Sequence, residues 1–214
     1  MGSDHYFSAQ PSTPFTRKRV RVVLGGTERT LSTAGGIFSP DGIDKGTAVL
    51  LDGVPAPAAE GDLLDIGCGW GPLALTMALA SPAATVHAVD VNQRSVELTR
   101  ENASALELGN VVASAPEAVP EAARFQTIWS NPPIRVGKDV LHEILLHWLP
   151  RLAPGGTAWL VVQKNLGSDS LQSWLARELP EGLAVSRHST AKSFRILRVD
   201  RAVEAARDEP VVAG

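Results

Sequence analysis

Between residues 62 and 162 the chain alternates short apolar runs with longer segments of helical spacing, and this alternation limits the fold more than any other feature. The apolar runs, predicted as strands, lie at 63–66, 86–89, 110–113, 125–130 and 157–162. The segments predicted as helices lie at 72–80, 93–107, 138–149 and 170–179. Repeated strand–helix units predict a parallel sheet with helices on both of its faces.

Two more runs, 183–187 and 194–199, follow the last predicted helix and have the alternation of strands. They are close together in sequence, so we expect them to form a terminal antiparallel pair. The sequence therefore predicts an α/β fold of the Rossmann-like kind, with a mostly parallel sheet of seven strands. Ligands in such folds bind beyond the carboxyl ends of the strands.

The segment before the sheet predicts an N-terminal extension. Residues 20–24 and 29–31 flank Gly25-Gly26, a pair that favours a β-hairpin turn, and helical spacing follows at 44–51. The expected organisation has three parts. They are an arm, hairpin and helix packed on the core over 1–60, the sheet domain over 61–200 and a disordered tail over 201–214.

Composition excludes several classes of protein. A net charge of −3 argues against a strongly basic nucleic-acid coat, and 44% hydrophobic residues are ordinary for a globular domain. Cys68 is the single cysteine, which excludes an internal disulfide and a zinc site made of several thiolates. Residues 1–15 have no apolar core of a signal peptide, and no apolar run is long enough to cross a membrane. We therefore expect a cytoplasmic protein that binds neither membrane nor metal.

A glycine-rich loop follows the first predicted strand. Gly67, Gly69 and Gly71 alternate there, a spacing that differs from the Gly-x-Gly-x-x-Gly of dinucleotide sites. A loop without Cβ atoms lets the backbone approach a ligand closely. Asp65 lies just before this loop and Asp90 ends the second predicted strand, where a carboxylate can accept both hydroxyls of a ribose. The pattern predicts a nucleoside-like ligand without a pyrophosphate.

The segment Asn131-Pro132-Pro133-Ile134 follows the fourth predicted strand and carries the predicted chemistry. An amide oxygen and a proline-held carbonyl can accept the two N–H bonds of an aromatic amine, and they can aim its nitrogen for in-line displacement. Pro132 and Pro133 fix φ and stiffen this loop. Such a reaction needs no nucleophilic side chain and no metal, and we interpret Asn131, Pro132 and Pro133 as the catalytic residues.

In this order the motifs resemble the S-adenosylmethionine-dependent methyltransferases of the "methyltransferase small domain" family, which includes ribosomal-RNA guanine-N2 methyltransferases. The resemblance covers roughly residues 5–199. The segments that carry it are His5-Tyr6-Phe7-Ser8, Gly36-Ile37-Phe38-Ser39, Gly42-Ile43-Asp44-Lys45-Gly46-Thr47, Asn131 to Lys138, Gln163-Lys164 and Lys192-Ser193-Phe194-Arg195.

The resemblance implies a role for each matching position. The residues expected to bind S-adenosylmethionine are Asp65, Gly67, Cys68, Gly69, Gly71, Asp90, Val91, Asn92 and Ala115, with Phe38, Gly46 and Thr47 closing over it. Asp65 would hold the ammonium of the methionine moiety. Ile134, Arg135 and Lys138 are expected to bind the substrate. Many amino-methyltransferases have an aromatic residue in place of Ile134, so stacking on the target base must come from elsewhere.

The function that this implies is methyl transfer to the exocyclic N2 amine of a guanine in ribosomal RNA. Arg17, Lys18, Arg19 and Arg21 form a basic cluster that would help to hold RNA, or else a solvated strand edge. Three alternatives stay open, namely methylation of a protein glutamine, methylation of a small metabolite, and a non-catalytic RNA-binding relative. An NAD dehydrogenase is disfavoured by the glycine spacing.

Overall fold

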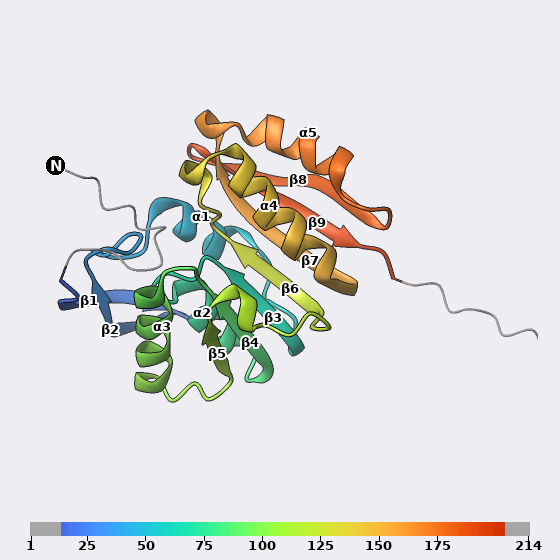
Figure 1. Ribbon diagram of the computed structural model, residues 1–214. Coiled ribbons are helices and arrows are strands. Elements are labelled where there is room, and N and C mark those ends of the chain that lie inside the picture. Colours follow the sequence, from blue (N-terminus) through green and yellow to red (C-terminus); the bar gives the residue numbers. More distant parts are fainter. Residues whose placement is uncertain (1–13, 204–214) are drawn as a thin grey trace, which may run out of the picture.

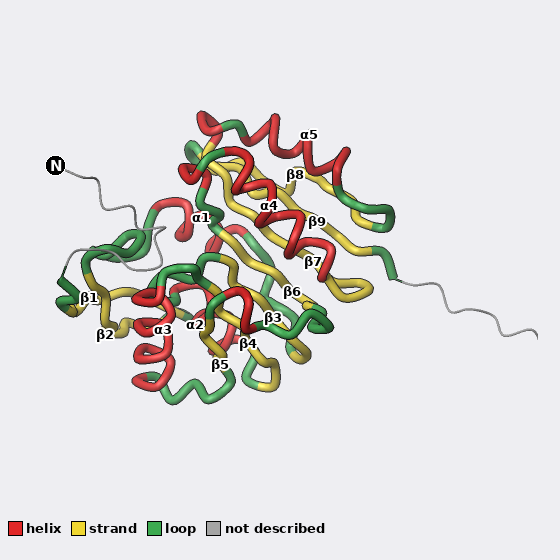
Figure 2. Tube along the Cα trace, viewed as in Figure 1, coloured by secondary structure: helices red, strands yellow, loops and turns green. Residues whose placement is uncertain are grey.

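A seven-stranded sheet runs through the centre of the protein in the computed structural model, which describes residues 14–203 (Figures 1 and 2). The strand order is β5-β4-β3-β6-β7-β9-β8. The first five strands of this order are parallel, whereas β9 is antiparallel to both of its neighbours. The strands are β3 (Glu60–Ile66), β4 (Ala83–Val89), β5 (Val111–Ser114), β6 (Phe125–Ser130), β7 (Leu152–Gln163), β8 (Leu183–Ala191) and β9 (Phe194–Arg201). The predicted fold class is confirmed, including the terminal antiparallel pair.

Five helices cover the two faces of this sheet, as Figure 1 shows. One face carries α1 (Lys45–Gly53), α2 (Pro72–Ala80) and α3 (Gln93–Ala105), and the other carries α4 (Lys138–Trp148) and α5 (Ser168–Glu178). Successive side chains of a strand point to opposite faces. Leu63 therefore belongs to the apolar cluster of α1 and α2, and Leu64 belongs to the cluster of α4 and α5. Both leucines are fully buried.

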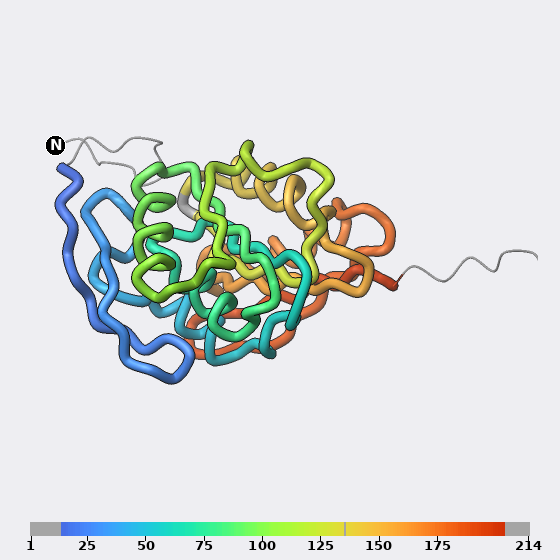
Figure 3. The backbone as a smooth tube through the Cα atoms, turned by 90° about the horizontal axis from the view of Figure 1, so that it is seen from below, coloured from blue at the N-terminus to red at the C-terminus, as the bar shows by residue number. Residues whose placement is uncertain are grey.

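The N-terminal hairpin forms a separate two-stranded sheet of β1 (Arg17–Leu24) and β2 (Thr27–Ala34). It lies alongside α3, as seen from below in Figure 3, and shares a third apolar cluster with α2 and α3. The buried side chain of Asn102 accepts a hydrogen bond from the Ser32 N–H (2.7 Å) and donates to the carbonyls of Ser32 and Trp70 (both 2.9 Å). One amide thus joins the hairpin to the end of the glycine loop.

The boundaries of helices and strands agree with the prediction where local sequence signals determine them. They differ where pairing between strands determines them. Helix α2 and strand β6 match the predicted bounds at both ends. Strand β7 begins at Leu152 rather than at residue 157, because Leu152 pairs with Phe125 before a register shift. A Cβ at Gly156 would lie 2.7 Å from the Phe125 carbonyl oxygen, so this shift requires a glycine. Arg201, expected to open the disordered tail, still belongs to β9.

Residues 204–214 of the predicted tail, and the motif at residues 5–8, lie outside the described part of the chain. Four short 3-10 helices, which the sequence did not predict, complete the fold. They are η1 (Pro116–Ala118), η2 (Ile134–Val136), η3 (Leu149–Arg151) and η4 (Lys164–Leu166). Among residues 14–203 no helix has the length and apolar character needed to cross a membrane.

Candidate active site

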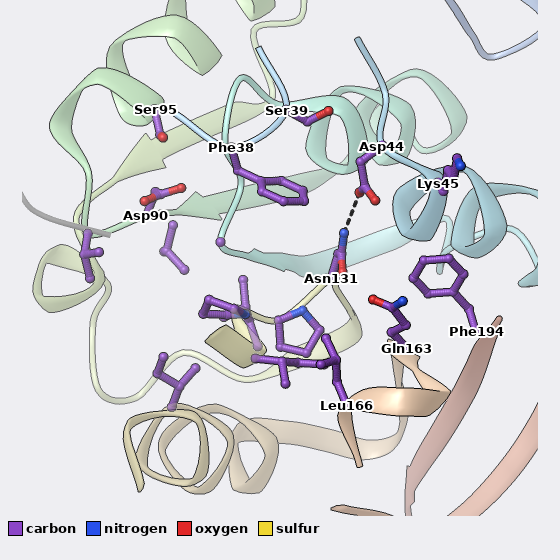
Figure 4. A pocket seen from close by; sticks show the side chains of 18 of the residues that line it. Phe38, Ser39, Asp44, Lys45, Asp90, Ser95, Asn131, Gln163, Leu166 and Phe194 are labelled. Carbon is purple, nitrogen blue, oxygen red and sulfur yellow. Dashed lines mark hydrogen bonds between the residues drawn. The ribbon is translucent and has the colours of Figure 1, made fainter. Parts of the chain in front are cut away.

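A cavity of about 670 Å³ opens at the carboxyl ends of the parallel strands (Figure 4). Gly67 after β3, Asp90 after β4 and Asn131 after β6 all line it. Gln163, at the end of β7, and Phe194, at the start of β9, lie beside each other in the strand register and line it too. The loop before α1 contributes Phe38, Ser39, Ile43 and Asp44, and α1 itself contributes Lys45. Residues predicted from three separate motifs therefore meet in one cavity.

The glycine loop presents backbone to this cavity. Gly67 and Gly69 have φ of +77° and +58°, and a Cβ built on either would meet no atom within 4 Å. Open space on that side leaves room for a ligand against the backbone. Gly71 differs, because it is the N-cap of α2 and a Cβ there would lie 3.2 Å from the Thr99 side chain. Gly71 does not line the cavity, and its glycine serves helix packing.

Asp65 lies beneath the glycine loop and is fully buried. Its Oδ2 accepts a hydrogen bond from the Ala74 N–H at 3.0 Å, and its Oδ1 has no hydrogen-bond partner in the described structure. Burial raises the pKa of this carboxyl to about 8. With Gly67, Cys68, Gly69 and Asn131 it lines a small recess next to the cavity. An unpartnered carboxylate oxygen at such a place fits a cationic group such as an ammonium.

Asp90 is held by two backbone donors. Its Oδ1 accepts from the Asn92 N–H at 2.8 Å and its Oδ2 from the Gly69 N–H at 3.0 Å. Burial raises its pKa, although these hydrogen bonds oppose the rise. A carboxylate has about four acceptor positions, and a side-chain hydrogen bond from Ser95 takes one more of them, so the carboxylate keeps capacity for a hydroxyl donor. The arrangement fits the predicted contact with a ribose.

The neighbours of Asp90 divide into residues that face the cavity and residues that do not. Val91 lines it and is 48% exposed. Asn92 is buried and caps α3: its Oδ1 accepts from the Arg94 N–H and its Nδ2 donates to the Gly36 carbonyl at 2.8 Å. Ala115 does not line the cavity, whereas Pro116 beside it does.

The buried Cys68 lines only the recess, and burial raises the pKa of its thiol, which makes it a poor nucleophile.

Asn131, Pro132, Pro133 and Ile134 line the cavity together. The amide nitrogen of Asn131 donates to Asp44 Oδ2 at 2.6 Å and to Thr47 Oγ1 at 3.1 Å. Since the nitrogen is engaged on the side of α1, the oxygen is the atom left to act as an acceptor. Figure 4 shows the bond between Asn131 and Asp44 as a dashed line across the cavity wall.

The three residues predicted to close over a cofactor lie at different depths. Phe38 is 42% exposed and stands between Asp90 and Asn131 in Figure 4. Thr47 is buried and lines the recess. Gly46 is buried and lines neither the cavity nor the recess, and a Cβ there would lie 3.0 Å from Phe194 Cε1 and 3.3 Å from Asn131 Nδ2. A glycine at this position allows those two side chains to pack against α1.

Of the residues predicted to bind substrate, Ile134 lines the cavity, while Lys138 is exposed at the start of α4 and does not. The side chain of Arg135 lies outside the described structure. No role was predicted from the sequence for Asp44, Ser95, Gln163 and Phe194, all of which line the cavity, although Asp44, Gln163 and Phe194 belong to segments that carry the resemblance. The pattern Asp44-x-x-Thr47 signals a helix N-cap, but no local signal shows that the same carboxylate reaches Asn131.

The predicted basic cluster is mostly used within the protein. Arg17 forms ion pairs with Glu97 and Glu101. Hydrogen bonds to these two carboxylates, with Glu101 contributing most, raise the pKa of the Arg17 guanidinium further. Lys18 lies 3.6 Å from Asp41, and Arg19 donates to Ser32 Oγ and the Thr30 carbonyl.

Other cations lie beside the cavity. Four lysines of this region are exposed and form no ion pair within residues 14–203. They are Lys45, Lys138, Lys164 and Lys192. In the same part of the chain no group of three or more His, Cys, Asp or Glu side chains could hold a metal ion.

Comparison with known proteins identifies relatives of the chain. The family model described as "Methyltransferase small domain" matches residues 28–198. The chain is 37% identical over 171 residues to the uncharacterized protein YbxB of Bacillus subtilis, covering 78% of this chain and 85% of that protein. It is 37% identical over 141 residues to ribosomal RNA small subunit methyltransferase C of Salmonella choleraesuis, covering 64% of this chain but 41% of that enzyme.

Among solved structures, the chain is similar to the 16S rRNA N2 methyltransferase RsmC of Thermus thermophilus, which was determined in complex with AdoMet and guanosine. The TM-score is 0.74 at 25% sequence identity, covering 90% of this chain and 52% of that one. A putative methyltransferase, yhhF, from Escherichia coli shares the fold with a TM-score of 0.61 at 19% identity, covering 87% of this chain and 100% of that one. The chain thus spans about half the length of the RsmC structure.

Proposed function

This chain belongs to the methyltransferase small domain family, and on that premise we propose that it transfers a methyl group from S-adenosylmethionine to the exocyclic N2 amine of a guanine in ribosomal RNA. The observation that carries the proposal is the Asn131 amide, whose nitrogen is bonded to Asp44 and Thr47 while the residue lines the cavity. An amide held in this way offers its oxygen to an incoming N–H donor.

The cofactor half of the cavity is formed by the ends of β3 and β4. When bound, S-adenosylmethionine supplies an electrophilic methyl group on a positively charged sulfur. The unpartnered Oδ1 of Asp65 suits the ammonium of its methionine moiety, and the Asp90 carboxylate suits its ribose hydroxyls. Gly67 lets backbone approach the ligand, and Phe38 stands over the space between the two halves of the cavity. These residues bind and orient the cofactor.

The acceptor half is formed by Asn131, Pro133, Ile134, Gln163 and Phe194. The Asn131 oxygen would accept one N–H of the amine, and the stiff proline loop would present a carbonyl to the other. Both contacts favour a pyramidal nitrogen aimed at the methyl group. The aromatic surface missing at Ile134 is available from Phe194, whose ring packs against Gly46 on the same wall. We therefore assign stacking on the base to Phe194.

The choice of RNA as substrate is supported by the names of relatives and by charge. Relatives named as ribosomal RNA methyltransferases share 35–37% identity with segments of this chain. Lys164 and Lys192 flank the cavity residues Gln163 and Ser193, and the Lys164 N–H donates to the Ser193 carbonyl at 2.8 Å. Two exposed cations at one rim of the cavity suit phosphate groups next to a target base.

The direct test is methylation in vitro. Purified protein is incubated with ribosomal RNA transcribed without modifications and with S-adenosylmethionine labelled in its methyl group, and the digested nucleosides are then separated by mass spectrometry. We expect label in N2-methylguanosine with the native protein and none with Asn131→Ala. If RNA takes up no label, but a protein glutamine or a small metabolite does when ribosomal protein or a metabolite extract replaces the RNA, that acceptor would replace the RNA proposal. Cofactor binding without any transfer would indicate a non-catalytic relative.

A further inference from the structure

We infer that Asp44 is a positioning residue that fixes the orientation of the Asn131 amide, so that the N-terminal extension completes the active site. The inference rests on the proposed function, because it assigns to Asn131 the role of accepting an N–H of the substrate. Asp44 precedes α1, outside the segment of alternating strands and helices, and lies 87 positions from Asn131 in sequence.

Asp44 makes more contacts than a helix cap needs. As the N-cap of α1 its Oδ1 accepts from the Gly46 N–H at 2.7 Å, and its Oδ2 accepts from the Thr47 N–H at 3.1 Å. The same Oδ2 also accepts from Thr47 Oγ1 and from Asn131 Nδ2, both at 2.6 Å. The contact with Asn131 joins two distant elements and has no part in capping. Two functions therefore converge on one carboxylate.

The contact determines which end of the amide faces the cavity. The oxygen and the NH2 group of an asparagine side chain have nearly the same shape, and a half-turn about the last torsion exchanges them. A carboxylate is only an acceptor, so it pairs with the NH2 group and rejects the oxygen. Thr47 Oγ1 reinforces this choice, since its own proton is directed to Asp44 and its lone pairs are left for Asn131. The oxygen of Asn131 is then left for the acceptor amine.

Two substitutions at Asp44 separate positioning from capping. Asn and Ser cap helices about as well as Asp. In Asp44→Asn the carboxylate oxygen that faces Asn131 is replaced by an NH2 group. Two NH2 groups cannot hydrogen-bond to each other, so the Asn131 amide turns by half a revolution. It then presents its NH2 group, instead of its oxygen, to the substrate. In Asp44→Ser the shorter side chain cannot reach Asn131, so the amide is free to take either orientation. If Asp44 positions the Asn131 amide, the two substitutions should therefore lower the methylation rate by different amounts, although Asn and Ser cap the helix equally well.

The experiment measures single-turnover methylation at saturating cofactor and RNA, together with cofactor affinity and melting temperature. We expect Asp44→Asn to lower the rate by about 100-fold, as for loss of one preorganised hydrogen bond, and Asp44→Ser to lower it by about tenfold. Cofactor affinity should fall less than the rate in both variants, because the argued contact of Asp44 is with Asn131, although Asp44 also lines the recess of Asp65. Thr47→Val, which removes the second contact, serves as a milder variant.

The inference would be overturned if both variants methylated RNA at the native rate, or if the rate fell only in step with the melting temperature. As a readout that does not depend on the substrate, the side-chain NH2 resonances of Asn131 are assigned by their loss in Asn131→Ser. They should shift in both Asp44 variants, and unchanged resonances would also overturn the inference. If the native protein methylates no RNA, the proposed function fails, whereas the resonances still test the contact.

Discussion

Asp65 is the residue whose chemistry depends most strongly on its surroundings. Burial raises the pKa of its carboxyl from 3.8 to about 8, so the folded protein holds a proton that the unfolded chain has released at neutral pH. Its contribution to stability is therefore complete below pH 4 and is lost as the pH rises toward 8. The opposite dependence would hold for a carboxylate paired with a cation.

Asp65→Asn should therefore stabilise the ligand-free protein more at higher pH, because the substitution removes a group that is costly to ionise in the interior. We expect the difference in the free energy of unfolding between variant and native protein to grow by about 2–4 kcal/mol from pH 5 to pH 8. Urea unfolding at both pH values measures it. Equal differences at the two pH values would show that Asp65 is ionised in the folded protein.

Asn131→Ala should abolish methyl transfer while leaving cofactor affinity nearly unchanged, because the amide acts on the acceptor amine. The loss should appear in the chemical step, as a fall of more than about 100-fold in the single-turnover rate at saturating substrate. Calorimetry with S-adenosylhomocysteine supplies the affinity. A fall of tenfold or less, or an equal loss of affinity, would exclude the role assigned to Asn131.

At the scale of elements, the hairpin depends on Asn102 for its attachment to the core. Asn102→Ala leaves the backbone N–H and carbonyl of Ser32 and the carbonyl of Trp70 without their partner in a buried place. We expect a loss of about 2–4 kcal/mol of stability and faster hydrogen exchange across β1 and β2. Asn110→Ala is the matched control, since its amide bonds only the carbonyls of Ser81 and Ala84. Slow exchange in the Asn102 variant would show that apolar packing alone holds the hairpin.

Elements with local signals were predictable, and elements set by distant pairing were not. Both elements were predicted to the residue, α2 from Pro72 at its start and β6 from the Phe125–Ser130 segment that ends at Asn131-Pro132-Pro133. The early start of β7 depends on its pairing with Phe125, which no local pattern reports. The same division holds in the site. Gly67, Asp90 and Asn131 had roles predicted from their motifs. Gln163 and Phe194 also belong to segments that carry the resemblance, but they meet because β7 and β9 are antiparallel neighbours, which no local pattern reports.

At the scale of the whole molecule, the cations of the hairpin and those beside the cavity differ in their surroundings. Arg17 is neutralised by two glutamates, whereas Lys164 and Lys192 are exposed beside the cavity. Binding to RNA fragments should therefore depend more on these lysines than on the hairpin. In a salt series, Lys164→Gln/Lys192→Gln should reduce the slope of log affinity against log salt by about 1.4, or 0.7 for each phosphate contact.

Arg21→Gln/Arg29→Gln is the control for this series, since it removes the same charge from the hairpin. We expect its salt slope to stay close to that of the native protein. If the salt slope flattened in the hairpin variant alone, the hairpin arginines would be the residues that contact RNA phosphates, and Lys164 and Lys192 would only be solvated surface residues.

Methyl transfer to a guanine of ribosomal RNA is tested most directly in cells. Ribosomal RNA from a strain that lacks this gene is digested and mapped by mass spectrometry, beside RNA from the same strain carrying the native gene or the Asn131→Ala form. We predict that one N2-methylguanosine is absent from the deletion strain, returns with the native gene and stays absent with Asn131→Ala. An identical set of methylated guanosines in all three strains would contradict the assigned function.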